Sequence, residues 1–384
     1  AAHLSRMFLM DELGYGEDTR VELRLRQIDV INNTLHRSDD AAELLESLIE
    51  QMPHHEEPWH QLDRMYRAHE DPSLLASLLV RRVERVGDAA DAVGLLREAA
   101  SIFSTKLNDH ESALAVLLDA VLKDPEDEAL LEDALSEART AERLDAYVTV
   151  AQDGLKTLEG DERALRTCAL ASIMADEADM GYEAVVLLEQ TVEDLDEPIS
   201  VLELLCTLLS KQDNVTEESR YLHQLFLAQD DTIAKISAAR RRAMILETKL
   251  ENLTEAAVVH ESIVSLEEGD KQALKALEDI YFKMNQIPDL IRTCERLIEV
   301  DIERQSELWF RVGTLQMEEM SDALKAAEAF ENVTTIDPNN LDSYQMLERT
   351  YGSLEDWAAL GDVYDRWAMA EPNPEGRAAV YRNL

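Results

Sequence analysis

The sequence predicts an all-α fold, an α-solenoid of stacked antiparallel helix hairpins, and three observations lead to that prediction. The first is composition: Gly 12 and Pro 9 are few for 384 residues, and an Ala-, Leu- and Glu-rich chain favours helix over strand. The second is apolar residues at helical spacing, as at Leu114, Leu117, Leu118, Val121 and Leu122. The third is an internal repeat. We expect about 21 helices in about 10 to 11 hairpins.

The repeat has a period of about 71 residues, which is the length of two hairpins. One column of apolar residues keeps this step throughout: Ile31, Ile102, Ile173, Met244 and Leu315. A second column holds alanine with one exception, which has Ala256 beside it: Ala42, Ala113, Ala184, Glu255 and Ala326. We expect the first column to occupy equivalent buried sites.

The period divides the chain into repeats, and we expect one continuous array over residues 1–384. The predicted repeats are 1–19 (partial), 20–90, 91–161, 162–232, 233–303, 304–374 and 375–384 (partial). The repeats differ in how clearly they are marked. Those between Glu162 and Gly269 keep the hydrophobic period but lose the aromatic and proline marks of the others.

Turn signals separate the helices within each repeat. They supply N-cap residues and prolines where one helix ends and the next begins. The clearest are 38–40, 123–127, 336–340 and 371–374. A hairpin of about 35 residues cannot bury its apolar face alone, so neighbouring hairpins must stack and share a core.

Residues 309–372 resemble two tetratricopeptide (TPR) repeats. The first carries Trp309, Val312, Gly313, Ala326, Phe330, Val333 and Pro338, and the second carries Tyr344, Leu347, Tyr351, Leu360, Tyr364, Trp367 and Pro372. The step from Pro338 to Pro372 equals one TPR period. A further partial match is Trp59, Leu62 and Tyr66. The whole chain resembles the long TPR-like arrays common in bacteria. That resemblance implies a protein-binding scaffold with a groove lined by the first helix of each hairpin.

The charge balance excludes several classes of partner. The chain has 80 Asp and Glu against 37 Lys and Arg, a formal charge of −43. Such a surface repels nucleic acid and anionic lipid, and no apolar run reaches the roughly 18 residues of a membrane helix. Either a salt-rich habitat or the choice of partner explains the charge. Three widely spaced cysteines indicate reduced thiols and a cytoplasmic protein, with the periplasm as the alternative.

The sequence contains few candidates for catalytic or metal-binding residues. His54, His55 and His60 lie within eight residues of one another beside two glutamates, but they do not form an HExxH motif. They are either surface histidines of a turn or an adventitious divalent-metal site. No cysteine has a neighbouring histidine in sequence, so no nucleophilic pair is suggested. We therefore predict no catalytic residue, cofactor or metal site.

Two basic runs stand out in so acidic a chain, 81–85 and 240–242. Three successive arginines on a helix fan over roughly 200°, so Arg240, Arg241 and Arg242 cannot share one face. Two interpretations stay open. The arginines either pair with acids on neighbouring helices or form a local anchor for an acidic partner segment.

The predicted partner groove uses non-core positions of the first helices, in the registers of Leu274, Trp309 and Tyr344. These positions are Gln272, Lys275, Asp279, Phe310, Thr314, Gln345 and Arg349. They do not form the Lys, Asn and Arg clamp by which some TPR domains hold a C-terminal carboxylate. Phe310 follows Trp309, and the two cannot both face one core stripe. Phe310 is thus either an exposed anchor for an amphipathic, acidic partner segment or packed against the adjacent hairpin.

These observations favour a non-catalytic scaffold that binds other proteins or peptides. The alternative is a regulatory or targeting module of a longer polypeptide whose catalytic domain lies elsewhere. Residues 377–381 begin a further hairpin without completing it, so we expect either continuation of the array or a capping partner at that end.

Overall fold

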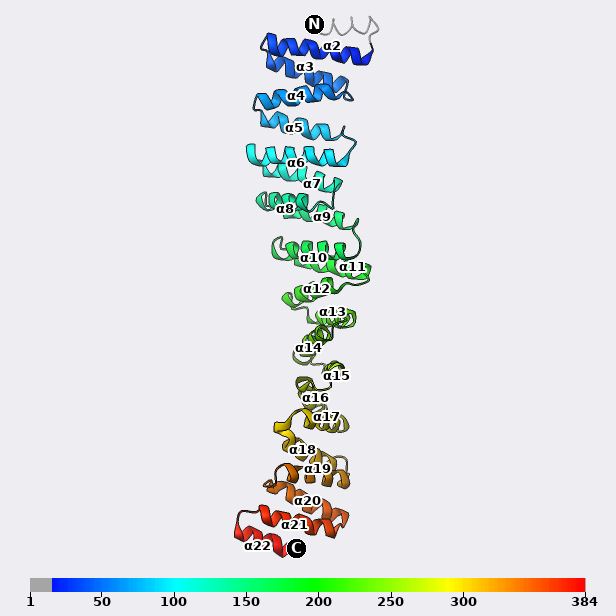
Figure 1. Cartoon of the computed structure of the whole chain (residues 1–384), viewed down its shortest axis with the longest axis vertical. Helices are drawn as coiled ribbons and strands as arrows, with labels where there is room; N and C mark the ends of the chain where they lie inside the picture. The colour runs from blue at the N-terminus through cyan, green and yellow to red at the C-terminus, as the bar shows by residue number, and fades with distance from the viewer. Residues whose placement is uncertain (1–15, 384) are drawn as a thin grey trace. The chain divides into compact units, whose positions relative to one another are not determined.

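The computed structural model describes residues 16–383, which form 21 α-helices, α2 to α22, and no strand (Figure 1). The predicted partial repeat 1–19 therefore lies mostly outside the described residues. The chain divides into two compact units, residues 1–196 and 197–384. The division falls inside the predicted repeat 162–232, and a single array over the whole chain stays a prediction.

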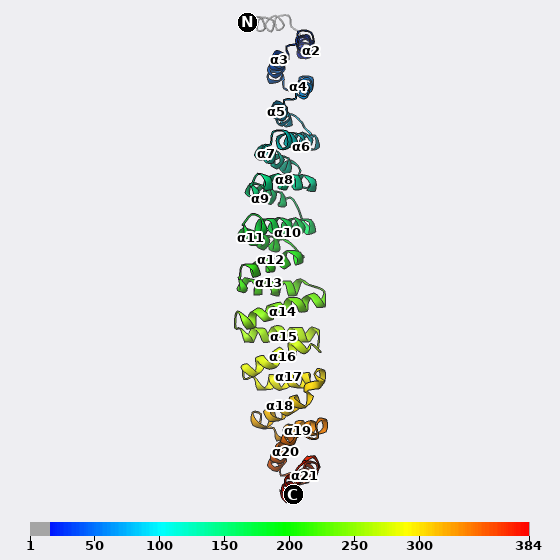
Figure 2. The same ribbon diagram turned by 90° about the vertical axis from the view of Figure 1, so that its left-hand side faces the viewer.

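The first unit contains five helix hairpins, each made of two consecutive helices. Their bounds are α2 Glu17–Asp29, α3 Ser38–Gln51, α4 Glu56–Ala68, α5 Pro72–Val83, α6 Ala89–Lys106, α7 His110–Lys123, α8 Glu128–Thr140, α9 Leu144–Leu155, α10 Gly160–Asp176 and α11 Gly181–Asp194. A π-helical turn, Val30–Thr34, follows α2. Within the unit each helix packs against the next one along the chain, as Figures 1 and 2 both show.

The second unit contains five further hairpins and a final helix. Their bounds are α12 Ile199–Lys211, α13 Val215–Ala228, α14 Thr232–Thr248, α15 Leu253–Leu266, α16 Lys271–Lys283, α17 Ile287–Val300, α18 Gln305–Glu318, α19 Ala323–Ile336, α20 Leu341–Leu354, α21 Trp357–Ala370 and α22 Pro374–Asn383. A short 3₁₀ helix, Ile302–Arg304, precedes α18. The predicted fold class, stacked antiparallel helix hairpins, is confirmed.

The turn inside each hairpin is built the same way. In all ten, one non-glycine residue adopts left-handed backbone geometry with φ between 51° and 56°. These residues are His36, Glu70, Asn108, Glu142, Asp179, Asp213, Glu251, Asn285, Ser321 and Glu355. Such a residue reverses the chain after a helix and satisfies its last carbonyls. The residue after it caps the next helix in several hairpins, as Asp71 does by accepting a hydrogen bond from the Leu74 backbone nitrogen.

These turns also explain the period. The step from His36 to Glu70 equals one TPR period, and the step from Glu70 to Asn108 is longer by a few residues. The same alternation of a short step with a longer one continues along the chain to Glu355. Two hairpin lengths therefore alternate, and together they give the period of about 71 residues found in the sequence, with slips of one residue.

The structure shifts the alanine column by one residue at two of its five members, where Ala41 and Ala256 take the places of Ala42 and Glu255. Five alanines lie five residues after a left-handed turn residue, and every one has an exposed fraction of 0%. They are Ala41, Ala113, Ala184, Ala256 and Ala326. Alanine fits because a larger side chain would separate the packed helices. Gly313 serves the same purpose, since a Cβ atom there would lie 2.7 Å from the Phe330 ring.

The apolar column was predicted wrongly. Ile102 is buried, Ile31, Ile173 and Leu315 are half-buried, and Met244 is 65% exposed. The turn after α14 comes one residue later than the regular step predicts, so Ile245 rather than Met244 occupies the position of Ile102. Ile245 is buried. A slip of one residue rotates a side chain by about 100° around the helix axis.

Candidate functional site

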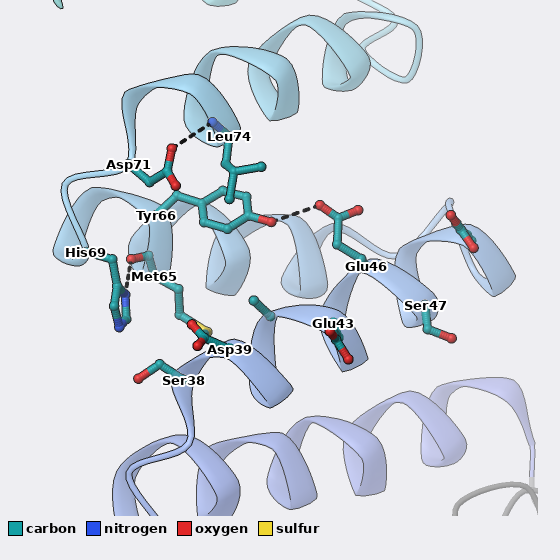
Figure 3. Close-up of a pocket in the computed structure, with 12 residues that line it drawn as sticks. Ser38, Asp39, Glu43, Glu46, Ser47, Met65, Tyr66, His69, Asp71 and Leu74 are labelled. Carbon is teal, nitrogen blue, oxygen red and sulfur yellow. Dashed lines mark hydrogen bonds between the residues drawn. The ribbon is translucent and has the colours of Figure 1, made fainter.

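A surface cavity of about 440 Å³ lies among α3, α4 and α5 in the first unit (Figure 3). We call it the acidic cavity. Its lining consists of Ser38, Asp39, Ala42, Glu43, Glu46, Ser47, Glu50, Met65, Tyr66, His69, Asp71 and Leu74. Five of these residues carry a carboxylate and none is Lys or Arg. Mutual repulsion of these charges favours a positively charged occupant over an anion.

Glu46 is the structural centre of this cavity. The Tyr66 hydroxyl donates to one carboxylate oxygen at 3.0 Å, and Arg81 Nη1 donates to the other at 2.8 Å. Burial, followed by the negative charge of Glu46, raises the pKa of Tyr66 to about 12. One carboxylate on α3 therefore connects α3 to both helices of the next hairpin.

This Glu–Tyr–Arg triad occurs three times. Glu261, Tyr281 and Arg296 form the second copy, and Glu331, Tyr351 and Arg366 form the third. In each copy the Tyr follows the Glu by 20 residues and the Arg follows it by 35. Sequence reasoning missed the triads, although this constant spacing is visible in the sequence. Their side chains bond to one another, which indicates a structural role.

Other residues of the acidic cavity have different roles. Asp71 caps α5, and His69 Nδ1 lies 2.7 Å from the Met65 carbonyl oxygen (Figure 3). The carboxylates of Asp39, Glu43 and Glu50 make no ion pair within residues 16–383. Across that same range, no group of three or more His, Cys, Asp and Glu side chains is arranged to hold a metal ion.

A second cavity, of about 490 Å³, lies among α14, α15 and α16 in the second unit. We call it the arginine cavity. Its lining consists of Arg240, Arg241, Met244, Glu247, Thr248, His260, Ile263, Gln272, Ala273 and Ala276. Two arginines and one carboxylate line it, and the other charged groups nearby lie outside the lining.

The arginines of α14 all pair with acids, as one of the two interpretations predicted. Arg240 binds Asp270, whose side chain is 2% exposed. Arg241 binds Glu218 at 2.6 Å and donates to the Cys206 carbonyl at 2.8 Å. Arg242 pairs with Glu255 and does not line the cavity, as expected from the rotation between successive residues.

His260 completes the polar lining. Its side chain is 8% exposed, and its Nε2 atom lies 2.7 Å from Glu247 Oε1. Its other ring nitrogen, Nδ1, is buried and has no hydrogen-bond partner. Buried polar atoms without a partner are uncommon, because burial removes their bonds to water without replacement.

The predicted groove residues lie on α16, α18 and α20. Gln272, Asp279, Gln345 and Arg349 are exposed, whereas Lys275, Phe310 and Thr314 are half-buried. The structure thus leaves four of the seven side chains open to solvent. Gln272 also belongs to the lining of the arginine cavity.

Three of these residues already have partners within their unit. Lys275 Nζ lies 3.1 Å from Asp301, and hydrogen bonds from Lys271 and Lys275 hold the pKa of that carboxyl below its usual range. The Thr314 hydroxyl donates to the Phe310 carbonyl at 3.0 Å.

Phe310 meets the Phe330 ring edge-on, with centroids 5.5 Å apart. Phe330 lies on α19, in the same hairpin as Phe310, and Phe310 packs against a core cluster that also includes Tyr344 and Leu347 of the adjacent hairpin. The Phe330 side chain needs a ring neighbour on this side, because Gly313 offers it no side chain.

None of the helices between residues 16 and 383 combines the length and the apolar character needed to cross a bilayer. No protein-family model matches the chain, and no curated protein matches it.

Solved structures do match. One is Naa15/Naa10 bound to HypK-THB, at 14% identity over 91% of this chain and a TM-score of 0.28. This chain spans only 58% of that one. Another is YrrB, "a TPR protein with an unusual peptide-binding site", at 19% identity over 51% of this chain and 98% of that one, with a TM-score of 0.28. A third is yeast Tom70, at 12% identity over 96% of this chain and 95% of that one, with a TM-score of 0.25. At these scores the TPR-like description rests on the hairpins and turns of the chain itself.

Proposed function

We propose that this chain is a non-catalytic scaffold that binds other proteins through the first helices of its second unit. The proposed surface consists of Gln272, Lys275, Asp279, Phe310, Thr314, Gln345 and Arg349, and is called the first-helix surface below. The carrying observation is at Gln345 and Arg349, which are exposed on one helix and make no side-chain bond within residues 16–383. They lie ten and six residues before the turn residue Glu355, as Lys275 and Asp279 do before Asn285.

The charge on this surface is mixed, with Lys275 and Arg349 against Asp279. Arg349 is a cation without an ion pair in the described residues, and the Phe310 ring is half-buried beside the same row of helices. An exposed arginine and an aromatic edge suit an amphipathic, acidic partner segment. The partner that we propose is a protein or peptide of that kind.

The cysteines support the non-catalytic part of the proposal. Burial raises the pKa of the Cys206 and Cys294 thiols to about 12. Because the thiolate is the reactive form, both groups are poor nucleophiles at neutral pH. The same surface would also serve a regulatory or targeting module of a longer polypeptide, and the complete flanking sequence distinguishes that alternative.

A pull-down from the native source with two charge-reversal variants tests the proposal. Arg349→Glu removes the cation of the first-helix surface, whereas Arg64→Glu is the control on α4 in the first unit, where Arg64 is exposed and lies 3.5 Å from Glu57. We expect mass spectrometry to show at least one partner lost with Arg349→Glu and kept with Arg64→Glu. Phe310→Ala should weaken the same partner, and its circular dichroism spectrum reports whether loss of the Phe330 contact disturbs folding. If all variants retain the same partners, the proposed surface is wrong and binding uses another surface.

A further inference from the structure

The arginine cavity lies on the first-helix side of the second unit and continues the first-helix surface. Arg240 precedes its hairpin turn residue, Glu251, by as many positions as Phe310 precedes Ser321. The same equality holds for Met244 before Glu251 and Thr314 before Ser321. Arg240 and Met244 thus occupy the positions of Phe310 and Thr314 on α18, one residue from the register of Gln345 and Arg349 on α20, and Gln272 belongs to both the cavity and the surface.

The helix that forms the cavity wall has an unusual charge. Its residues 232–248 contain four basic residues and a single acid, Glu247, in a chain with 80 acids. The acidic cavity, by contrast, is lined by five carboxylates without a base. An anionic segment that is repelled from most of the molecule meets hydrogen-bond donors here.

Buried carboxylates hold the two cavity arginines in place. The carboxylates of Asp270 and Glu218 are buried, with 2% and 4% of their side chains exposed, whereas Arg240 and Arg241 are 44% and 39% exposed. A guanidinium has five N–H donors in a planar fork, so these pairs leave donors available on the exposed edge. Because the arginines are already oriented, binding an anion costs little side-chain entropy.

A third polar group of the lining is unsatisfied. His260 has one nitrogen bonded to Glu247 and the other, Nδ1, buried without a partner. The bond to the Glu247 carboxylate puts the proton on Nε2, so Nδ1 of the neutral ring is an acceptor and a carboxylate occupant does not bond to it. The remaining lining is apolar and includes Met244, which is 65% exposed although it is the longest apolar side chain of the cavity. Methionine adapts its shape to an incoming side chain.

From these contacts we infer that the arginine cavity receives an internal Asp or Glu side chain of a partner peptide, with an apolar residue of the same peptide against Met244. This inference rests on the proposed function, because it names the partner chemistry for one end of the first-helix surface. The carboxylate accepts from the nitrogens that the existing pairs leave open, Nη1 of Arg241 and Nε or Nη1 of Arg240, so that each oxygen faces one arginine.

Selection from a phage-displayed library of random dodecapeptides tests the inference with the full chain as bait. The displayed peptides are fused at their C-terminus, so no free terminal carboxylate is offered. We expect the enriched peptides to share an Asp or Glu beside an apolar residue. A synthetic copy with an amidated C-terminus should bind, and its Glu→Gln or Asp→Asn version should bind about tenfold more weakly in fluorescence polarisation.

Variants at Met244 test the location without breaking an ion pair. Met244→Glu places a carboxylate at the cavity and should weaken the selected peptide by about tenfold or more, because like charges then oppose each other. Met244→Gln, of the same length and without charge, removes only the apolar contact and should weaken the peptide less than Met244→Glu does. Arg240→Gln should also weaken binding, with hydrogen exchange of α14 and α16 reporting whether the fold persists.

The outcomes separate the two proposals. Enriched peptides without acids, or binding that Met244→Glu leaves unchanged, would overturn the acidic-segment inference, while sensitivity to Arg349→Glu would still support the first-helix surface. If the wild-type chain enriches no peptide at all, both the inference and the proposed peptide-binding scaffold are overturned.

Discussion

The acidic cavity and the arginine cavity are built on the same kind of scaffold but differ in charge. Each lies among three consecutive helices, yet one is lined by five carboxylates and the other by two arginines and one carboxylate. The acidic cavity involves two second helices, α3 and α5, whereas the arginine cavity involves two first helices, α14 and α16. The hairpin packing therefore leaves the charge of a surface to the residues outside the core.

The acids near the two cavities also differ in burial. Glu46 is 28% exposed and bonds to Arg81, whereas Asp270 is 2% exposed and bonds to Arg240. An exposed carboxylate is stabilised by water when its partner is lost, but a buried one is not. The arginine cavity is therefore the more sensitive of the two to loss of the arginine that pairs with its acid.

The largest expected effect is the loss of stability when the acid that caps a helix at each cavity is replaced by alanine. Asp270 and Asp71 both cap a helix, by accepting from the Ala273 and Leu74 backbone nitrogens, but only Asp270 also holds a cavity arginine. We expect Asp270→Ala to lower the free energy of local unfolding by about 2–4 kcal/mol, and Asp71→Ala by about 1 kcal/mol. Hydrogen exchange of α16 and α5 measures both. Equal losses would show that the Arg240 pair adds nothing.

The triads provide an intermediate effect that should be the same in both units. Removing one hydroxyl with Tyr66→Phe or Tyr281→Phe breaks a bond of 3.0 Å to Glu46 or Glu261. Each change should cost about 1 kcal/mol of local stability, measured by hydrogen exchange of α4 and α16. A cost in one unit alone would mean that the two triads are not equivalent.

Alkaline pH tests the same bonds without substitution. Burial and the neighbouring glutamate raise the pKa of both Tyr66 and Tyr281 to about 12, above the ordinary value of about 10. A raised pKa in the folded state means that the stabilisation is complete below pH of about 10 and is lost as the pH rises through about 12. Tyrosine absorbance near 295 nm should show a late transition that Tyr66→Phe and Tyr281→Phe each reduce. A single transition near pH 10 would contradict the buried triads.

The smallest expected effect concerns the acidic cavity alone. Asp39 and Glu43 are one helical turn apart on α3 and make no ion pair in the described residues, so they repel each other. Glu43→Gln should stabilise α3 by about 0.2–0.5 kcal/mol, and this gain should shrink at about 1 M salt as the repulsion is screened. Gln51→Asn, on the same helix, is a control that leaves the charge of α3 unchanged. A gain in stability that does not change with salt concentration would instead indicate a difference in helix propensity between glutamate and glutamine.

Sequence periodicity predicted the helical class and the hairpins, and its alanine column holds Ala113, Ala184 and Ala326, which the structure buries. It failed at Met244, because a fixed step does not follow hairpins whose turn spacing varies by one residue in either direction. It also left open whether Arg240, Arg241 and Arg242 pair with acids. The partners Asp270 and Glu218 lie 30 and 23 residues away, and no local pattern identifies them.

The sequence by itself determined that this chain forms helices with apolar faces, where the chain reverses, and that its surface carries a large negative charge. These properties depend on residues three or four apart and on composition. Only the tertiary structure decided which polar side chains meet: the Glu–Tyr–Arg triads, the buried acids behind Arg240 and Arg241, and the unpartnered nitrogen of His260. The reason is geometric, because helix packing sets the rotation of each helix against its neighbour, and a shift of one residue turns a side chain by about 100°.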